Sequence, residues 1–313
     1  MRVAVVDIGT NSTRLLIADV GPDGALTEVD RRTTITRLGQ GVDKTGLLAD
    51  EAMDRVYAAL ARYREAIDAA GAEATVGVLT SAVRDARNGE EFTAAVAGRY
   101  GVDARSISGD EEARLSFLGA TSERGDDPAR LVVIDIGGGS TEFVVGARGE
   151  VGFHVSTQAG VVRHTERFLR SDPPAGEELQ LLADEAAEIF SGSFPEDVRA
   201  GVEAGIAVAG TATSCAAIAQ RLDPYDPARV EGFRLLRAQC EEQLARLAGM
   251  TEAERRQVPG LHPDRAPTIV AGVVLLIEAM RAFGLDEVEV SEHDILRGAA
   301  LARAAAAGGA STG

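Results

Sequence analysis

The same set of residues that could bind an anion and a cation occurs twice in this sequence. Residues 3–17 read VAVVDIGTNSTRLLI and residues 131–145 read LVVIDIGGGSTEFVV. In each copy an apolar run ends at an aspartate, Asp7 or Asp135, and a turn of small residues leads to a second apolar run. Each copy predicts a β-hairpin whose turn exposes N–H and hydroxyl donors to an anion, beside a carboxylate suited to hydrated Mg²⁺. The first interpretation is a phosphate site that faces itself across a cleft.

Three more motifs accompany the two loops: TSAVRDA at residues 80–86, SGDEEARL at 108–115 and GTATS at 210–214. Together the five motifs resemble the exopolyphosphatase / guanosine pentaphosphate phosphohydrolase (Ppx/GppA) family of the actin-like, sugar kinase and heat-shock-70 superfamily. The resemblance runs in motif order over nearly the whole chain, whereas DIGGGSTE alone would indicate only the superfamily. It implies an α/β fold of two duplicated actin-like (ribonuclease H-like) domains around a central cleft. We expect them at 1–125 and 126–313, with a C-terminal helix that can pack back on the first.

The apolar pattern predicts strands that alternate with helices after an opening meander, which is typical of an α/β fold with a mixed sheet. The second half repeats the plan of the first and adds helices. In the first half we expect strands at 2–7, 13–20, 75–79 and near 102–107, a third extended run to about residue 38, and helices at about 50–70, 89–99 and 109–122. In the second half we expect strands at 131–136, 141–147, 150–157 and 286–290, and helices from 161 and at about 176–191, 234–249, 266–283 and 294–307.

Composition narrows the class of protein. The chain has 313 residues, a net charge of −17, and two cysteines, Cys215 and Cys240. No apolar run approaches the ~20 residues of a membrane span, and no leader pattern opens the chain, so we expect a cytoplasmic protein without membrane partners. The absence of a basic run or an aromatic platform argues against a nucleic-acid binder. The negative charge does not exclude a polyanionic substrate, because a substrate responds to the local field.

The motif SGDEEARL carries the hypothesis about catalysis. Ser108 and Glu111 have the spacing of a capping box, which would tie Glu111 to the start of a helix and leave Glu112 as a carboxylate of a different kind. The resemblance implies that Glu112 is the general base that activates the attacking water. The alternative is that Asp110, Glu111 and Glu112 only complement the helix dipole.

The resemblance also implies ligands for a metal and for phosphate. Asp135 and Glu142 would hold Mg²⁺, or another divalent cation such as Mn²⁺, with Asp7 near it. Arg14 stands in the first copy where Glu142 stands in the second. The alternative for both residues is that they point outward from their strands and form surface ion pairs, which contribute little to stability. The residues expected to contact phosphate are Asn11, Ser12, Thr13, Arg14 and Arg84 in the first half, and Gly137, Gly138, Gly139 and Ser140 in the second.

Two other features have a functional and a plain interpretation. Arg163, Arg167 and Arg170 recur at i, i+4 and i+7, so we expect them on one helix face. That face is either a track for an extended polyphosphate or a solvated surface. GTATS at 210–214 either lines the cleft or only turns a strand into a helix.

The expected function is an exopolyphosphatase that releases terminal orthophosphate from linear inorganic polyphosphate by metal-assisted in-line hydrolysis. One alternative is hydrolysis of guanosine pentaphosphate to the tetraphosphate with the same machinery. Another is a non-catalytic phosphate- or nucleotide-sensing module, and a kinase is a third. The sequence leaves open which polyphosphate chain length is preferred and whether the protein forms a homodimer. The additional C-terminal helical domains of long exopolyphosphatases are absent from these 313 residues.

Overall fold

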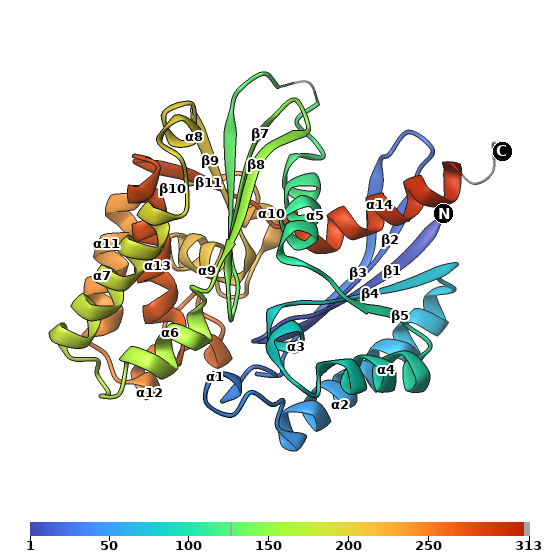
Figure 1. Ribbon diagram of the computed structural model, residues 1–313, viewed down its shortest axis with the longest axis horizontal. Coiled ribbons are helices and arrows are strands. Elements are labelled where there is room, and N and C mark those ends of the chain that lie inside the picture. Colours follow the sequence, from blue (N-terminus) through green and yellow to red (C-terminus); the bar gives the residue numbers. More distant parts are fainter. Residues whose placement is uncertain (126, 310–313) are drawn as a thin grey trace. The chain divides into compact units, whose positions relative to one another are not determined.

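The computed structural model describes residues 1–125 and 127–309, and Figure 1 shows the path of the chain. The chain divides into two compact units. The first contains Met1–Gly119 and the C-terminal segment from Asp294, and the second is Ala120–His293. The predicted boundary between residues 125 and 126 falls at Asp126, outside the described residues, so it stays a prediction.

The first unit is built on a five-stranded mixed sheet in the order β3-β2-β1-β4-β5. β1 and β2 form the expected antiparallel hairpin, β3 continues the meander, and β4 and β5 add in parallel. The strands are β1 (Arg2–Ile8), β2 (Ser12–Val20), β3 (Leu26–Ile35), β4 (Ala74–Leu79) and β5 (Asp103–Ser106).

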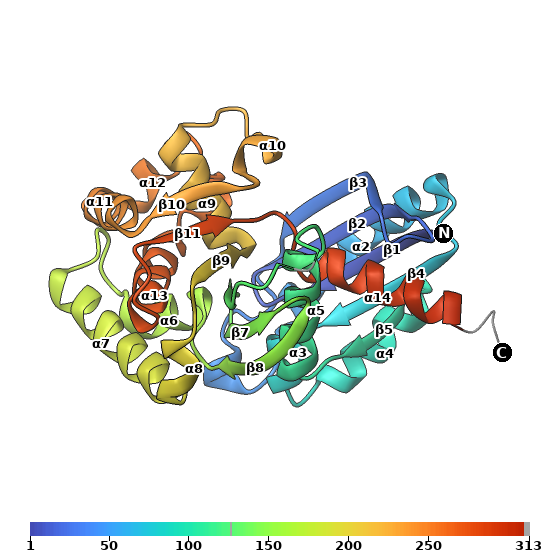
Figure 2. The same cartoon turned by 90° about the horizontal axis from the view of Figure 1, so that it is seen from above.

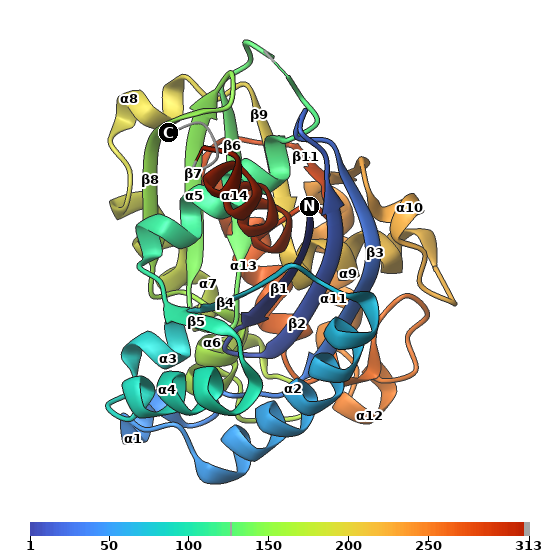
Figure 3. The same cartoon turned by 90° about the vertical axis from the view of Figure 1, so that its right-hand side faces the viewer.

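Successive side chains of β1 enter two different cores, because side chains alternate across a strand. Ala4 and Val6 belong to the core that includes residues of α2 and α4, whereas Val3 and Val5 belong to the core that includes residues of α5 and α14. Figure 3 shows the two pairs of helices on opposite faces of the sheet, and Figure 2 shows α14 lying along it. The C-terminal helix therefore packs on the first sheet. The helices of this unit are α1 (Val42–Thr45), α2 (Asp50–Ala70), α3 (Ser81–Asp85), α4 (Gly89–Tyr100), α5 (Gly109–Thr121) and α14 (Ile295–Gly309).

The second unit repeats this topology. Its six strands have the order β10-β11-β9-β6-β7-β8, so β8-β7-β6-β9-β11 corresponds to β3-β2-β1-β4-β5 and β10 is an addition. The prediction of a duplicated α/β fold with mixed sheets is confirmed. The strands are β6 (Leu131–Ile136), β7 (Thr141–Ala147), β8 (Glu150–Thr157), β9 (Ala204–Val208), β10 (Phe233–Leu236) and β11 (Glu287–Val290).

The predicted helix at 234–249 is wrong over its first residues. Phe233–Leu236 pair antiparallel with β11, and the helix begins only at Arg237. A short apolar run is compatible with a strand or a helix. Here the hydrogen-bonded pairing with β11 makes it a strand. The helices, several of which lie on one side of the sheet in Figure 1, are α6 (Val161–Phe168), α7 (Gly176–Gly192), α8 (Glu196–Ala200), α9 (Ala209–Gln220), α10 (Pro227–Val230), α11 (Arg237–Ala248), α12 (Glu252–Arg255) and α13 (Ile269–Ala282). None of the described helices combines the length and the hydropathy of a membrane span.

Candidate active site

The two turns that join the repeated hairpins have the same backbone geometry. The Gly9 N–H donates to the Ser12 carbonyl and the Gly137 N–H donates to the Ser140 carbonyl, each at 2.9 Å. The second turn is also fixed from outside, because the first N–H groups of α6 donate to the Gly137 and Gly138 carbonyls. The predicted hairpins are therefore present in both units, and the second glycine turn is held on the start of a helix.

The residues that flank each turn face each other across the hairpin, and their charges differ between the copies. Asp7 is opposite Arg14, whereas Asp135 is opposite Glu142. Asp135 is 8% exposed and Glu142 is 1% exposed, and the Ser156 hydroxyl donates to Glu142 Oε1 at 2.7 Å. Carboxylates on opposite residues of one hairpin supply oxygen ligands of the kind that Mg²⁺ takes in proteins. This carboxylate pair fits a divalent cation.

In the first hairpin an arginine compensates the buried aspartate. Arg14 Nε donates to Asp7 Oδ2 at 2.8 Å, its NH2 group lies 2.7 Å from the same oxygen, and its NH1 group pairs with Asp294 just before α14. Burial raises the pKa of Asp7, although the positive charge of Arg14 acts to lower it. Burial acts on Asp294 in the same direction, but the charges of Arg14 and Arg31 and the hydrogen bonds from Arg14 and the Leu296 N–H together outweigh it, so the pKa of Asp294 lies below its ordinary value.

The other oxygen of Asp7 supports a role near a cation. Oδ1 is buried, and the described residues offer it no hydrogen-bond partner. A buried carboxylate oxygen requires a partner. Over the described ranges, no three His, Cys, Asp or Glu side chains form a metal-binding group. Mg²⁺ commonly takes only one or two carboxylates and completes its shell with water and phosphate oxygens, so the residues present fit it.

The structure brings the predicted base and one predicted phosphate ligand together. Glu112 lies in the first turn of α5 and is 8% exposed. Arg84 NH1, from the end of α3, donates to Glu112 Oε2 at 3.1 Å and to the Ile107 carbonyl at 3.0 Å. Both residues belong to the first unit. One guanidinium therefore fixes the orientation of the Glu112 carboxylate.

Glu111 has a different environment, although not the one that the capping box predicts. The Ser108 hydroxyl accepts from the Glu111 N–H at 3.1 Å, but the Glu111 carboxylate takes two hydrogen bonds from Arg105, at 2.8 and 2.6 Å. A bidentate guanidinium is a stronger partner than a single backbone N–H, which explains why only half of the box forms. The two neighbouring glutamates are held by different arginines.

Several predicted phosphate ligands serve the fold of the hairpin. Thr13 is fully buried, and its hydroxyl shares a hydrogen bond with Thr36 at 3.0 Å. Its counterpart Thr141 donates to the Ala159 carbonyl in the second unit. The Asn11 carbonyl accepts from two N–H groups of the loop after β3. The Thr13 side chain therefore holds the hairpin together, while Ser12 and Ser140 stay as candidates at the turns themselves.

The predicted arginine face is wrong. Helix α6 ends at Phe168 and Leu169 is extended, so Arg170 lies outside the helix. The N–H groups of Arg170 and Ser171 donate to the Glu178 carboxylate instead of to helix carbonyls, and Pro173 prevents the helix from continuing past Asp172. Arg163 Nε donates to the Gly139 carbonyl at 2.8 Å, and Arg167 pairs with Glu185 at 2.5 Å. Arg163 therefore supports the glycine turn, and a role of the three arginines in binding polyphosphate stays a prediction.

Replacement of Arg163 by alanine should lower turnover about 10-fold on short and long polyphosphate alike. The turn at 137–140 loses a charge-assisted hydrogen bond worth about 1.5–3 kcal/mol. Steady-state phosphate release on two chain lengths measures the effect. Arg170→Ala is the matched control and should change neither rate more than about 2-fold. A loss for Arg163→Ala that grows with chain length would contradict this role and restore the track.

The family follows from the sequence taken as a whole. The model of the Ppx/GppA phosphatase family matches residues 16–301. The chain belongs to this family. It is 43% identical to Exopolyphosphatase 2 of Mycobacterium tuberculosis, over 97% of this chain and 98% of that protein. It is 30% identical to Exopolyphosphatase 1 of Mycobacterium bovis, over 96% and 88%.

Solved structures of the Ppx/GppA family have the same fold. An exopolyphosphatase-like protein superposes with a TM-score of 0.88 at 36% identity, over 96% of this chain and 98% of that one. The Aquifex aeolicus family member superposes with a TM-score of 0.81 at 31% identity, over 97% and 98%. The resemblance predicted from five motifs is confirmed, and the chain is a phosphatase-family protein of the short form.

A buried histidine lies on α6, the helix whose first N–H groups hold the glycine turn. His164, on α6, is 1% exposed, and both ring nitrogens lack a hydrogen-bond partner within the described residues. Its Nε2 lies 3.8 Å from Glu185 Oε2, and Arg163 and Arg167 are its charged neighbours on α6. Burial, with a smaller contribution from the two arginines, lowers the pKa of His164 to about 4. The ring is neutral at physiological pH.

This histidine should make the protein acid-sensitive. The unfolded chain takes up a proton near pH 6.5, whereas the folded protein does so only near pH 4, so stability is lost as the pH falls through this window. We expect a loss of about 2 kcal/mol in unfolding free energy between pH 7 and pH 5 from this residue. Urea unfolding of the wild type and of His164→Leu measures it. An equal pH slope in both proteins would show that His164 does not contribute.

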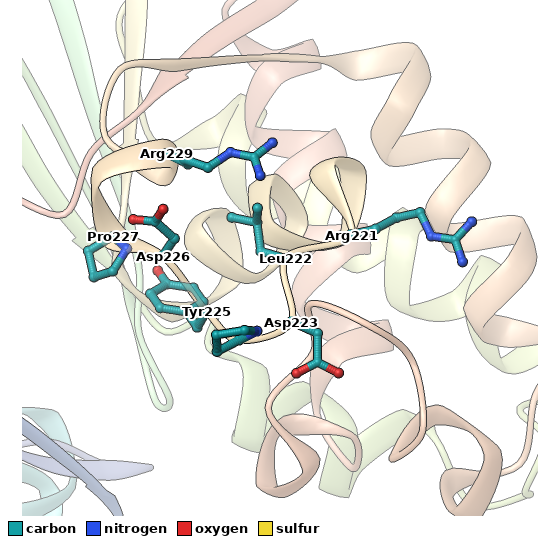
Figure 4. Close-up of a pocket in the computed structure, with 8 residues that line it drawn as sticks. Arg221, Leu222, Asp223, Tyr225, Asp226, Pro227 and Arg229 are labelled. Carbon is teal, nitrogen blue, oxygen red and sulfur yellow. The ribbon is translucent and has the colours of Figure 1, made fainter.

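The segment GTATS turns β9 into α9, with Ala209 at a φ of 61°. A pocket of about 430 Å³ lies beyond the other end of α9 (Figure 4). Its lining includes Tyr225, whose hydroxyl bonds to Glu292. None of the predicted site residues contributes to this lining within the described chain, which is formed by Arg221, Leu222, Asp223, Pro224, Tyr225, Asp226, Pro227 and Arg229.

One residue of the candidate site was missed from the sequence. Asp294 is 3% exposed and is an ion-pair partner of Arg14. The sequence contains a signal for this residue. Ser291 and Asp294, just before the closing helix, have the same Ser-x-x-acid spacing as Ser108 and Glu111. The spacing indicates a helix start, but it does not indicate which distant arginine the acid will meet.

Proposed function

We propose that this protein is an exopolyphosphatase that releases orthophosphate from the end of linear polyphosphate. The observation that carries the choice of substrate is the 43% identity, over nearly the full length of both chains, to a protein named Exopolyphosphatase 2. The carboxylate pair Asp135–Glu142 and the partly buried Glu112–Arg84 pair supply the chemistry that such a reaction needs.

Glu112 is the general base of the proposed reaction. It orients a water molecule and accepts its proton at a carboxylate oxygen, while Arg84 keeps the carboxylate in place. The water oxygen attacks the terminal phosphorus in line, the bridging P–O bond breaks, and the shortened chain leaves with the bridging oxygen. Orthophosphate is the other product.

Asp135 and Glu142 would hold Mg²⁺ in the second unit, and Asp7 Oδ1 is the corresponding candidate ligand of the first unit. When bound, the ion neutralises charge on the transferred phosphoryl group, where most of the catalysis of phosphoryl transfer lies. The N–H groups of the turn at Gly138, Gly139 and Ser140 would bind phosphate oxygens in the second unit, and Ser12 and Arg14 are the candidate phosphate ligands of the first unit.

Phosphate release with Mg²⁺ from four substrates in parallel tests this proposal. The substrates are short polyphosphate, long polyphosphate, guanosine pentaphosphate and ATP. We expect the highest kcat/KM on polyphosphate. A kcat/KM at least ~10-fold higher on guanosine pentaphosphate than on polyphosphate would show that guanosine pentaphosphate is the substrate. Binding of polyphosphate without release of phosphate would indicate a sensing module.

A further inference from the structure

We propose that Asp294 is a positioning residue for Arg14, so that the C-terminal helix α14 belongs to the catalytic machinery. The inference rests on the proposed function, because Arg14 and Asp7 act in it. Asp294 is far along the chain from Arg14 and Asp7. It is contributed by an element that carries no other part of the proposed site.

The contacts of Arg14 define the role. The Nε–H of its guanidinium donates to Asp7 Oδ2, an N–H of NH1 donates to Asp294, and NH2 lies within ion-pair distance of Asp7 Oδ2. The side chains of Asp7 and Asp294 are 5% and 4% exposed, and that of Arg14 is 16% exposed. A planar guanidinium held by two carboxylates in different directions has one orientation. Its remaining edge is the one that can meet a phosphate oxygen.

Asp294 is itself held firmly. Its Oδ1 atom accepts from the Leu296 N–H at 3.1 Å, so the side chain caps its own helix while it binds Arg14. Displacement of this carboxylate by a substrate phosphate would break the cap and leave a buried charge without its partner, which is costly. The geometry therefore favours a fixed support for Arg14 over a competitor that substrate must displace.

The depth of Asp294 depends on a close crossing of α5 and α14. A Cβ on Gly119 would lie 2.0 Å from the Asp294 carbonyl oxygen, and a Cβ on Gly298 would lie 1.9 Å from the Leu115 carbonyl oxygen. The four residues of this contact belong to the first unit. The backbone contact fixes the start of α14 against the helix that carries Glu112.

The duplication explains why α14 supplies this carboxylate. α5 follows β5 and α14 follows β11, and these two strands hold corresponding places in the sheets. Glu112 of the first helix binds Arg84, and Asp294 at the start of the second binds Arg14. Glu112 is the fourth residue of α5, whereas the fourth residue of α14 is Gly298. The second copy therefore lacks the proposed base and holds an arginine through the residue just before its helix.

Asp294→Asn tests the inference, because asparagine keeps the helix cap and removes the charge. We expect kcat on polyphosphate to fall about 10-fold, with a smaller change in KM. In an Arg14→Lys background the same substitution should cost less than about 2-fold, since residues that act through one another are not additive. Asp286→Asn is the matched control, because Asp286 forms an exposed pair with Arg237.

An unchanged kcat, a lower KM with a higher kcat, or full additivity with Arg14→Lys would each overturn the inference. If Asp294→Asn does not fold, Asp294→Glu keeps the charge and moves it by one methylene. A kcat equal to that of the wild type would then also overturn it. Failure of the proposed function is distinguishable, because in that case the wild type itself releases no phosphate from polyphosphate.

Discussion

Glu112→Gln should lower the turnover number on polyphosphate by about 100-fold or more, which is within the usual range for loss of a general base. Glutamine keeps the size of the side chain, and its carbonyl oxygen can still accept from Arg84. The fold and substrate binding should therefore persist, while the group that accepts the proton of the water is gone. The measurement is kcat and KM from phosphate release, with the melting temperature as a check on the fold.

Glu111→Gln is the matched control for this experiment. Glu111 makes the same kind of contact with a different arginine, Arg105, whose side chain is 52% exposed. Exposed ion pairs contribute little, so activity should stay within about 2-fold of the wild type. A result in which Glu111→Gln loses activity and Glu112→Gln keeps it would show that the two glutamates are assigned backwards.

The second large effect concerns the metal. Asp135→Asn and Glu142→Gln should each raise the Mg²⁺ concentration for half-maximal rate by at least about 10-fold, because even the partners of metal ligands cost 10–100-fold in affinity when they are removed. Glu150→Gln, which alters an exposed carboxylate at the start of β8, is the control. Activity that survives complete chelation by EDTA would contradict the metal role.

A measurement without turnover separates metal binding from catalysis. Mg²⁺ stabilises the folded protein to the extent that it binds the folded state and not the unfolded state. The wild type should therefore melt at a higher temperature with Mg²⁺, and Glu142→Gln should show a much smaller shift. Without Mg²⁺ the variant should be at least as stable as the wild type, because one of two facing carboxylates has lost its charge.

Sequence reasoning located the hairpins well because their signal is local. Apolar runs that end at Asp7 and Asp135, with turns of small residues after them, leave few alternatives for the backbone. The antiparallel register then places Arg14 opposite Asp7 and Glu142 opposite Asp135. The divergence in charge between the copies is visible in the sequence, although its structural result, a neutralised carboxylate in one copy and a carboxylate pair in the other, required the register.

The remaining site contacts depend on tertiary packing. Nothing near Arg14 in the sequence indicates that Asp294 will reach it, because that contact follows from the packing of α14 on the first sheet. Likewise, a capping-box spacing cannot show that Arg105 takes the Glu111 carboxylate. The end of α6 before Arg170 is only partly local. The proline pair after Asp172 limits the helix, but the N–H groups of Arg170 and Ser171 donate to Glu178 of α7, which the sequence does not show.

The most direct test of the central claim is a time course of polyphosphate of defined length by ³¹P NMR, with Mg²⁺ and with wild type and Glu112→Gln in parallel. Terminal, internal and free phosphate give separate signals. With the wild type, we expect orthophosphate from the first time points, at the expense of internal phosphate, while the amount of chain-end phosphate stays constant. Glu112→Gln should show almost no change. A rise in chain-end phosphate without orthophosphate, or equal rates for the two proteins, would contradict hydrolysis of the terminal phosphate by a Glu112-activated water.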